Sequence, residues 1–321
     1  MLQRLYSCFR SHFRMYRRTF SVLLDVIGQD LAGFGVGRPR YNPAQQVEIA
    51  LWHLVNLEVH RKTSLVFNVA MDTAHRTTIR FCDAVIAHRN DFMFWPQGGE
   101  ALEVMQEFQA ISGIPRIKGV IDSSDIEVSD PVENAQAHHN RKNFMSIKLQ
   151  GVVLPNRSFS DVYTGEPGAM HDARQFRRSP LGDELMDAQQ RQQLLPNDSH
   201  LLADSAYQLQ TFMLTPYRGN GLNAIEANYN VCLSSTRIVV EHTFGMLKNR
   251  FRCLQFLYRF NPNIPPKIVL TCCILHNLCV VQDDLYNFVR DNNLPHPNAN
   301  QFAGVQHINA VQKRDMIALA L

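Results

Sequence analysis

The segment from Leu201 to Leu254 constrains this chain more than any other stretch. It opens with the short apolar run Leu201-Leu202-Ala203, which stops at Asp204 and then turns through Ser205-Ala206-Tyr207. An apolar run bounded by turn residues is typical of a buried strand. The pattern therefore predicts a strand that carries a carboxylate, Asp204, at its carboxyl end.

The end of the same segment predicts an amphipathic helix. Its apolar residues recur at i, i+4, i+7 and i+11, a spacing that forms one buried stripe: Val240, Phe244, Leu247 and Phe251. Ser234 or Ser235 is expected to cap the start of this helix. A second stripe lies beside the first and consists of Arg237, Glu241, Gly245, Lys248 and Arg252.

This second stripe combines a lone carboxylate, a glycine and cations. A glycine inside a helix costs roughly 1 kcal/mol relative to alanine, so Gly245 indicates a close approach, either of another backbone or of a nucleic-acid strand. A carboxylate near a polyanion needs a divalent cation between them. Lys248 and Arg252 would then hold phosphates on either side.

The composition allows a sizeable core and is compatible with a DNA partner without demanding one. The chain has 321 residues, 45% of them hydrophobic, and a net charge of +3. Its seven cysteines lack paired spacing, which indicates reduced thiols in an intracellular protein. The run from Ile268 to Val281, with Cys272, Cys273, His276 and Cys279, is interpreted as a core helix rather than a metal site or a membrane span.

The pattern predicts three parts. Residues 1–112 are expected to be helical, with a short helix over 64–70, a turn, and a longer helix that carries Thr77, Thr78 and Arg80. That layout is typical of a helix-turn-helix that reads DNA, and plain packing of a small bundle explains it equally well. Residues 113–282 mix strands and helices, and residues 283–321 form a tail with a last short helix.

The middle part supplies further acids. The apolar run over 118–121 leads into Asp122, two strands over 145–154 and 158–164 form a hairpin, and Asp172 opens a helix. For Asp172, a helix cap is as good an explanation as a metal ligand. Between these elements, a polar loop carries Arg141 and Lys142, which are predicted to contact a nucleic-acid backbone, after His138 and His139, predicted to be surface residues.

The order of these elements predicts a metal site. Asp122 and Asp204 at the ends of adjacent strands, with Glu241 from a helix packed on the sheet, would form a cage of oxygen ligands suited to Mg²⁺ or Mn²⁺. Two such ions roughly 4 Å apart can activate a water or a 3′-hydroxyl and stabilise the leaving oxygen of a phosphodiester.

Five blocks occur in order along the chain: GVIDSSDIEV, GEPGAMHDARQF, LLADSAYQL, VVEHTFGMLKNRFRCL and CCILHNLCV. Together they resemble the PIF/Harbinger transposases and their domesticated nuclease-like relatives, which belong to the DDE superfamily of endonucleases. The resemblance implies an α/β fold, with an RNase H-like mixed β-sheet flanked by helices and preceded by an all-helical N-terminal region. It implies catalysis by Asp122, Asp204 and Glu241, with Asp172 added as a metal-binding acid.

For function, the resemblance implies a metal-dependent DNA endonuclease that cleaves phosphodiesters and transfers the freed 3′-hydroxyl end to target DNA. The alternative is a domesticated, catalytically silent scaffold that binds DNA or protein. The resemblance also implies a Myb-like DNA-binding partner, a homo-oligomer, and a nuclear location, with the cytoplasm as a second one. Ser123, Lys148 and Ala203 depart from the family pattern, but no departure removes an acid.

Overall fold

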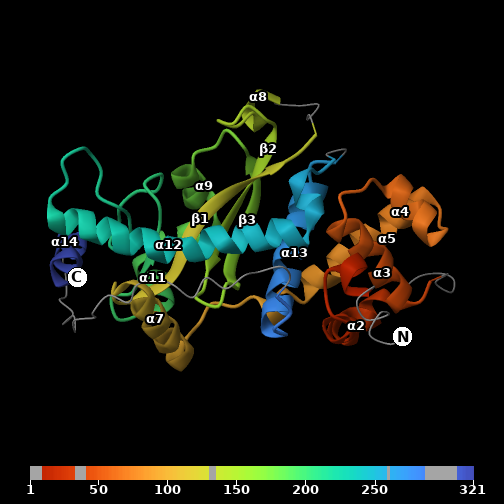
Figure 1. Cartoon of the computed structure of the whole chain (residues 1–321), viewed down its shortest axis with the longest axis horizontal. Coiled ribbons are helices and arrows are strands. Elements are labelled where there is room, and N and C mark those ends of the chain that lie inside the picture. The colour runs from red at the N-terminus through yellow and green to blue at the C-terminus, as the bar shows by residue number, and fades with distance from the viewer. Residues whose placement is uncertain (1–8, 33–40, 130–134, 259–260, 286–308) are drawn as a thin grey trace.

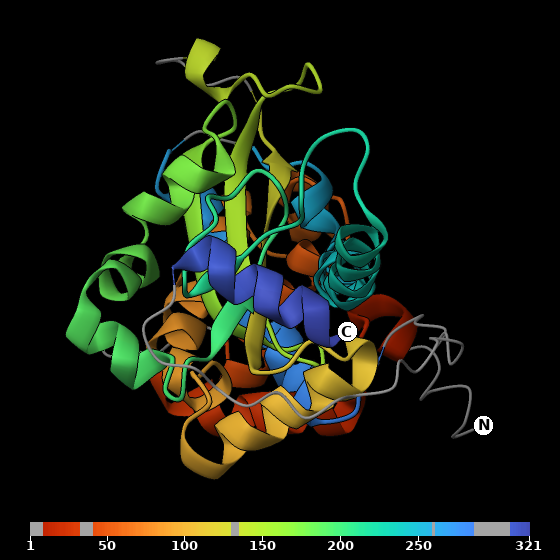
Figure 2. The ribbon, with the colours of Figure 1, turned by 90° about the vertical axis from the view of Figure 1, so that its left-hand side faces the viewer.

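A five-stranded mixed sheet with the order β3-β2-β1-β4-β5 lies at the centre of the fold, and helices cover both of its faces (Figures 1 and 2). The computed structural model describes residues 9–32, 41–129, 135–258, 261–285 and 309–321. The strands are β1 (Ile117–Glu127), β2 (Ser146–Val153), β3 (Phe159–Pro167), β4 (His200–Leu202) and β5 (Met213–Leu214). The first three pair antiparallel, whereas β4 runs parallel to β1 and β5 parallel to β4. The predicted α/β, RNase H-like fold class is confirmed.

Alternation along β1 divides the residues around the sheet between two cores. Val120 packs into the larger core, which includes the helices α12 (Ala224–Arg250) and α13 (Ile264–Val281). Its neighbour Ile121 packs into a smaller core with Phe176 of α9 (Asp172–Arg178) and with α10 (Pro180–Met186). Figure 2 shows α12 and the green α9–α11 group on opposite sides of the sheet. Because successive strand residues point to opposite faces, Asp122 shares the α12 face with Val120.

The N-terminal part is helical, as predicted. Its helices are α2 (Arg17–Leu31), α3 (Pro43–Val55), α4 (His60–Phe67), α5 (Met71–Ala87), α6 (Arg89–Phe92) and α7 (Gly98–Ser112). Thr77 and Thr78 on α5 are buried, and Arg80 donates a hydrogen bond to Leu31 O (3.2 Å). A helix that reads DNA would have to expose these three side chains. Their positions therefore agree with the packing alternative.

The long helix α12 begins earlier than predicted. Asn223 caps it through a capping box with Glu226, each side chain bonding the backbone N–H of the other residue. Ser235 lies inside the helix and donates to Cys232 O, so the prediction that a serine caps this helix is wrong. The predicted apolar stripe is buried along its whole length: Val240, Phe244, Leu247 and Phe251.

Asp187 separates two short helices, α10 and α11 (Ala188–Leu194). The extended backbone of Asp187 ends α10, and its carboxylate caps α11 by accepting from two backbone N–H groups. A short acidic side chain that competes for backbone donors is typical of such a boundary.

The apolar helix α13 crosses the core, as predicted. Within the described ranges it is the one helix long and apolar enough to cross a membrane by length and composition, and 67% of it is buried inside the protein. His276 donates to Arg157 O, and Asn277 donates to Phe92 O and Phe159 O. Cys272, Cys273 and Cys279 are buried as well.

The C-terminal helix α14 (Ala310–Ala320) folds back onto α12. Lys313 ties α14 to the segments that lead into β4 and β5, because it donates to Asp198 O and Thr211 O, both at 2.8 Å. Of the predicted tail, residues 286–308 lie outside the described residues. The domain boundaries at 112/113 and 282/283 stay predictions.

Candidate active site

The register of the parallel strands places two of the predicted acids level with each other. Val120 on β1 pairs with Leu202 on β4, and Asp122 and Asp204 each follow two residues later. Asp204 stands beyond the end of β4, as predicted, and accepts a hydrogen bond from Ala206 N–H (2.9 Å). Asp122 instead lies inside β1, because β1 stays paired with β2 as far as Glu127. The prediction that Asp122 ends its strand is therefore wrong.

One arginine joins the first acid to the helix acid. Arg237 Nη2 donates to Asp122 Oδ2 at 2.8 Å and lies 3.7 Å from Glu241 Oε1. The two carboxylate oxygens thus lie no farther apart than the sum of these distances. Sequence reasoning placed Arg237 beside Glu241 but missed its bond to Asp122. The i,i+4 spacing of Arg237 and Glu241 indicates that these two residues pair, but it gives no sign of the bond to Asp122.

Asp122 is held in an environment that opposes its charge. The pKa of this carboxyl is raised to about 6, mainly by burial, and the neighbouring Asp204 acts in the same direction. Arg237 and the backbone N–H of Ser123 act in the opposite direction. A carboxylate in such surroundings gains from any added positive charge.

Tyr207 forms the buried wall behind these acids. Burial, and then Asp122, Asp172 and Asp204, raise the pKa of its phenol well above the usual value. The hydroxyl therefore stays protonated and can act as a donor toward the acids. Within the described part of the chain it has no hydrogen-bond partner. Sequence reasoning placed Tyr207 in the turn after Asp204 and assigned it no role.

Asp172 pairs with a different cation from Asp122, although the charges of both acids act on the Tyr207 hydroxyl. Lys148 Nζ lies 3.1 Å from Asp172 Oδ1 and 3.3 Å from Asp125 Oδ1. The N-cap of α9 is His171, and the first turn receives no side-chain cap bond. The alternative that Asp172 caps this helix is therefore wrong. The contact with Lys148 was also missed, although alternation along β2 could have placed Lys148 opposite Asp125.

The residues predicted to contact nucleic acid differ in whether their charged groups are exposed or are bound to other protein atoms. Arg252, Lys142 and Arg141 are exposed, and Arg141 bonds to His171 Nδ1. Lys248 is bound to the protein, because its ammonium donates to Ser124 Oγ and Asp125 O, and burial lowers its pKa. In the same loop, His138 is buried and its Nδ1 bonds to Ser146 O, so the prediction that it is a surface residue is wrong.

Gly245 faces open space. Apart from its chain neighbours and the backbone of its own helix, no atom of the described residues lies within 4 Å of the position that a Cβ would take. The sequence offered two explanations for this glycine, a close protein backbone or a close nucleic-acid strand. Among the described residues, no protein backbone from outside its helix approaches Gly245, so the first explanation is excluded for them. The bare helix surface lies between Glu241 and Lys248, one turn from each.

We expect Gly245→Ala to raise the free energy of unfolding by about 1 kcal/mol, because alanine favours a helix interior and the added methyl meets nothing. Gly151→Ala is the matched control, since a Cβ there would lie 2.8 Å from the Phe159 ring. That variant should lose stability. Urea unfolding measures both, and a loss of stability in Gly245→Ala would contradict the open surface.

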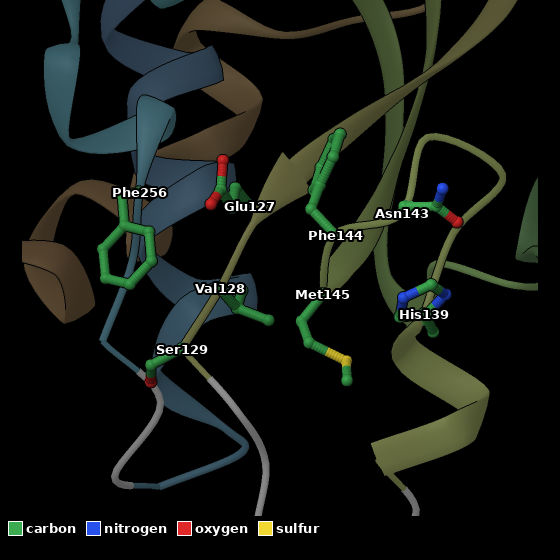
Figure 3. Close-up of a pocket in the computed structure, with 8 residues that line it drawn as sticks. All are labelled: Glu127, Val128, Ser129, His139, Asn143, Phe144, Met145 and Phe256. Atoms are coloured by element: carbon green, nitrogen blue, oxygen red, sulfur yellow. The ribbon is translucent and has the colours of Figure 1, made fainter.

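A separate pocket of about 520 Å³ lies at the far end of β1 (Figure 3). Its lining consists of Glu127, Val128, Ser129, His139, Asn143, Phe144, Met145 and Phe256. None of the four predicted metal-binding acids lines it. We therefore assign the candidate chemistry to the acids around Arg237 and not to this pocket.

The chemistry of the acids fits a hard divalent ion, although their side chains are not gathered around one. Among the residues that the structure describes, no three His, Cys, Asp or Glu side chains form a group that could hold a metal. The Arg237 guanidinium lies between Asp122 and Glu241, where its single positive charge faces both carboxylates. Carboxylate oxygens are the ligands that Mg²⁺ and Mn²⁺ prefer. These acids therefore fit such an ion by their chemistry.

Comparison with known proteins identifies the family of this region. Residues 121–277, which include all four predicted acids, match the DDE superfamily endonuclease family. This segment is a DDE superfamily endonuclease domain. Enzymes with such a domain generally use divalent metal ions.

The relatives of this DDE endonuclease domain agree with the predicted resemblance, which is confirmed. The human protein named "Putative nuclease HARBI1" is 25% identical over 266 residues, 82% of this chain and 74% of that protein. "Protein ALP1-like" of Arabidopsis thaliana is 26% identical over 295 residues, 86% of this chain and 71% of that protein. No solved structure matches the chain.

Proposed function

We propose that the chain is a metal-dependent DNA endonuclease that hydrolyses phosphodiesters and transfers the freed 3′-hydroxyl end to target DNA. One observation carries the proposal: Arg237 bonds Asp122 and reaches Glu241, while the β1–β4 register sets Asp204 beside Asp122. The names of the nuclease relatives and the DDE endonuclease family support the same reaction class.

The proposed metal ligands are Asp122, Asp204 and Glu241. When bound, Mg²⁺ or Mn²⁺ supplies the positive charge that activates a nucleophilic oxygen and stabilises the leaving oxygen. Arg237 donates to Asp122 in the structure, so this guanidinium and a bound metal ion would compete for the oxygens of the Asp122 carboxylate. Asp172, predicted as a fourth ligand, is considered separately below.

The proposed DNA path follows the exposed side of α12. Gly245 lets a phosphate backbone come close to Glu241, and Arg252 provides an exposed cation beyond the end of the helix. Arg141 and Lys142 extend the positive charge across the loop before β2, and Lys248 of α12 adds a cation that is held against Ser124 of β1. Cations in such a row bind phosphates without regard to sequence.

The partners and the location follow from the same proposal. A nuclease of this kind acts on DNA in the nucleus, with the cytoplasm as a second location. The mild net charge of +3 is compatible with help from a separate Myb-like DNA-binding protein and with assembly into a homo-oligomer.

Plasmid nicking tests the proposal. Supercoiled DNA is incubated with the full chain and Mg²⁺, with Mn²⁺, or with EDTA. We expect nicked product with either ion and none with EDTA. The alternative function, a silent scaffold with the same fold, predicts DNA or protein binding without nicking under every condition.

A further inference from the structure

Two groups of acids lie on opposite faces of β1. Asp122 and Asp125 are three residues apart on one strand, so their side chains point to opposite sides of the sheet. Asp122 points toward α12, where Arg237 binds it. Asp125 pairs across the sheet with Lys148 and lies on the side of α9, which carries Asp172.

Glycine allows the chain to bring Asp172 to this second group. A Cβ on Gly168 would lie 2.0 Å from Ser146 Oγ and 2.8 Å from His138 O, so only glycine permits the loop before α9 to pack so closely on β2. Ser146 in turn donates to Asp125 Oδ1 (3.2 Å). The close packing of the loop before α9 thus places Asp172, and the bond from Ser146 orients Asp125.

Lys148 occupies the space between the two carboxylates. Its ammonium lies 3.3 Å from Asp125 and 3.1 Å from Asp172, and the three side chains are only 12%, 17% and 20% exposed. Limited exposure leaves little solvent to screen the attraction. A divalent ion needs oxygen ligands at about 2.0–2.6 Å, so it cannot share this position with the ammonium group.

We propose that Lys148 is a built-in counterion that excludes metal from the Asp125–Asp172 pair, so that Asp172 is a positioning residue for Lys148 and not a metal ligand. This inference rests on the proposed function, in which divalent ions bind on the other face at Asp122, Asp204 and Glu241. It predicts that the lysine alone decides whether the second pair of acids takes a metal ion.

Counting bound Mn²⁺ tests the proposal without any activity measurement. Equilibrium dialysis and electron paramagnetic resonance count the ions on the full wild-type chain and on Lys148→Met, Asp172→Asn and the double variant. We expect Asp172→Asn to bind as many ions as wild type. Lys148→Met should bind one more ion per chain, and the double variant should lose that extra ion.

The control variant is Lys148→Arg, which keeps the charge and should add no ion, and circular dichroism confirms that each variant is folded. If Lys148→Met does not fold, Lys148→Gln replaces it. The proposal is overturned if Asp172→Asn alone loses a bound ion, or if the folded Lys148 variant gains none. Failure of the proposed function gives a different result. In that case Asp122→Asn would bind as many Mn²⁺ ions as wild type.

Discussion

Glu241→Gln is expected to lower Mg²⁺-dependent DNA nicking by more than about 100-fold. Loss of a residue that merely orients a metal ligand costs 10–100-fold in metal affinity or activity, and Glu241 is proposed to be a ligand itself. The substitution keeps the shape of the side chain and removes only its charge. The fold should survive, because Glu241 is 57% exposed and its pair with Arg237 is long, at 3.7 Å.

Glu103→Gln on α7 is the matched control. Glu103 is, like Glu241, an exposed glutamate in a helix, and the chemical change is the same. Its nicking rate should equal that of wild type. Equal nicking by Glu241→Gln and wild type would remove Glu241 from the proposed site. No nicking by wild type itself would favour the scaffold.

Lowering the pH should strongly destabilise the fold, because several buried histidines stay uncharged in the folded chain. Burial lowers the pKa of His53 to about 3 and those of His60 and His276 to about 4, while that of His200 falls well below its usual value. His53 and His60 also stack at 3.9 Å, so charging one disfavours charging the other.

The direction of the stability change with pH follows from a comparison of proton binding in the folded and the unfolded chain. Below pH 6.5 the unfolded chain binds protons at these histidines and the folded chain does not, so stability is lost as the pH falls toward 4. Each histidine costs up to about 1.4 kcal/mol per pH unit over that range. Asp122 acts oppositely, because its pKa is raised to about 6 and its protonation favours the folded chain. The histidines outnumber it.

Urea unfolding at pH 7.5 and pH 5.0 measures this effect, and we expect a loss of several kcal/mol at the lower pH. His53→Asn separates titration from packing, because it should flatten the slope of stability against pH even if it lowers stability at both values. A slope that is unchanged in His53→Asn would mean that His53 is not held neutral by the fold.

Sequence patterns were sufficient for the features that depend on short-range periodicity. The buried stripe of α12, the hairpin of β2 and β3, and the position of Asp204 after β4 follow from local alternation of apolar and polar residues. The family resemblance supplied the order of the acids along the chain.

What the sequence could not provide is which acids face one another. The polar residues from Asp122 to Glu127 resemble a loop, yet they form strand because β2 supplies backbone partners for them. That extension is what sets Asp125 opposite Lys148 and turns it away from Asp122. Likewise, the bond from Arg237 to Asp122 joins residues 115 positions apart, which no local pattern encodes.

Anomalous scattering from crystals soaked in Mn²⁺ tests the metal centre most directly. We predict a peak within about 2.0–2.6 Å of carboxylate oxygens of Asp122, Asp204 and Glu241, with the Arg237 side chain moved away from Asp122. The opposite result is a crystal with no peak at these three acids and with Arg237 still bound to Asp122, from a protein that nicks DNA in solution. That result would contradict the proposal that the three acids form the catalytic metal site.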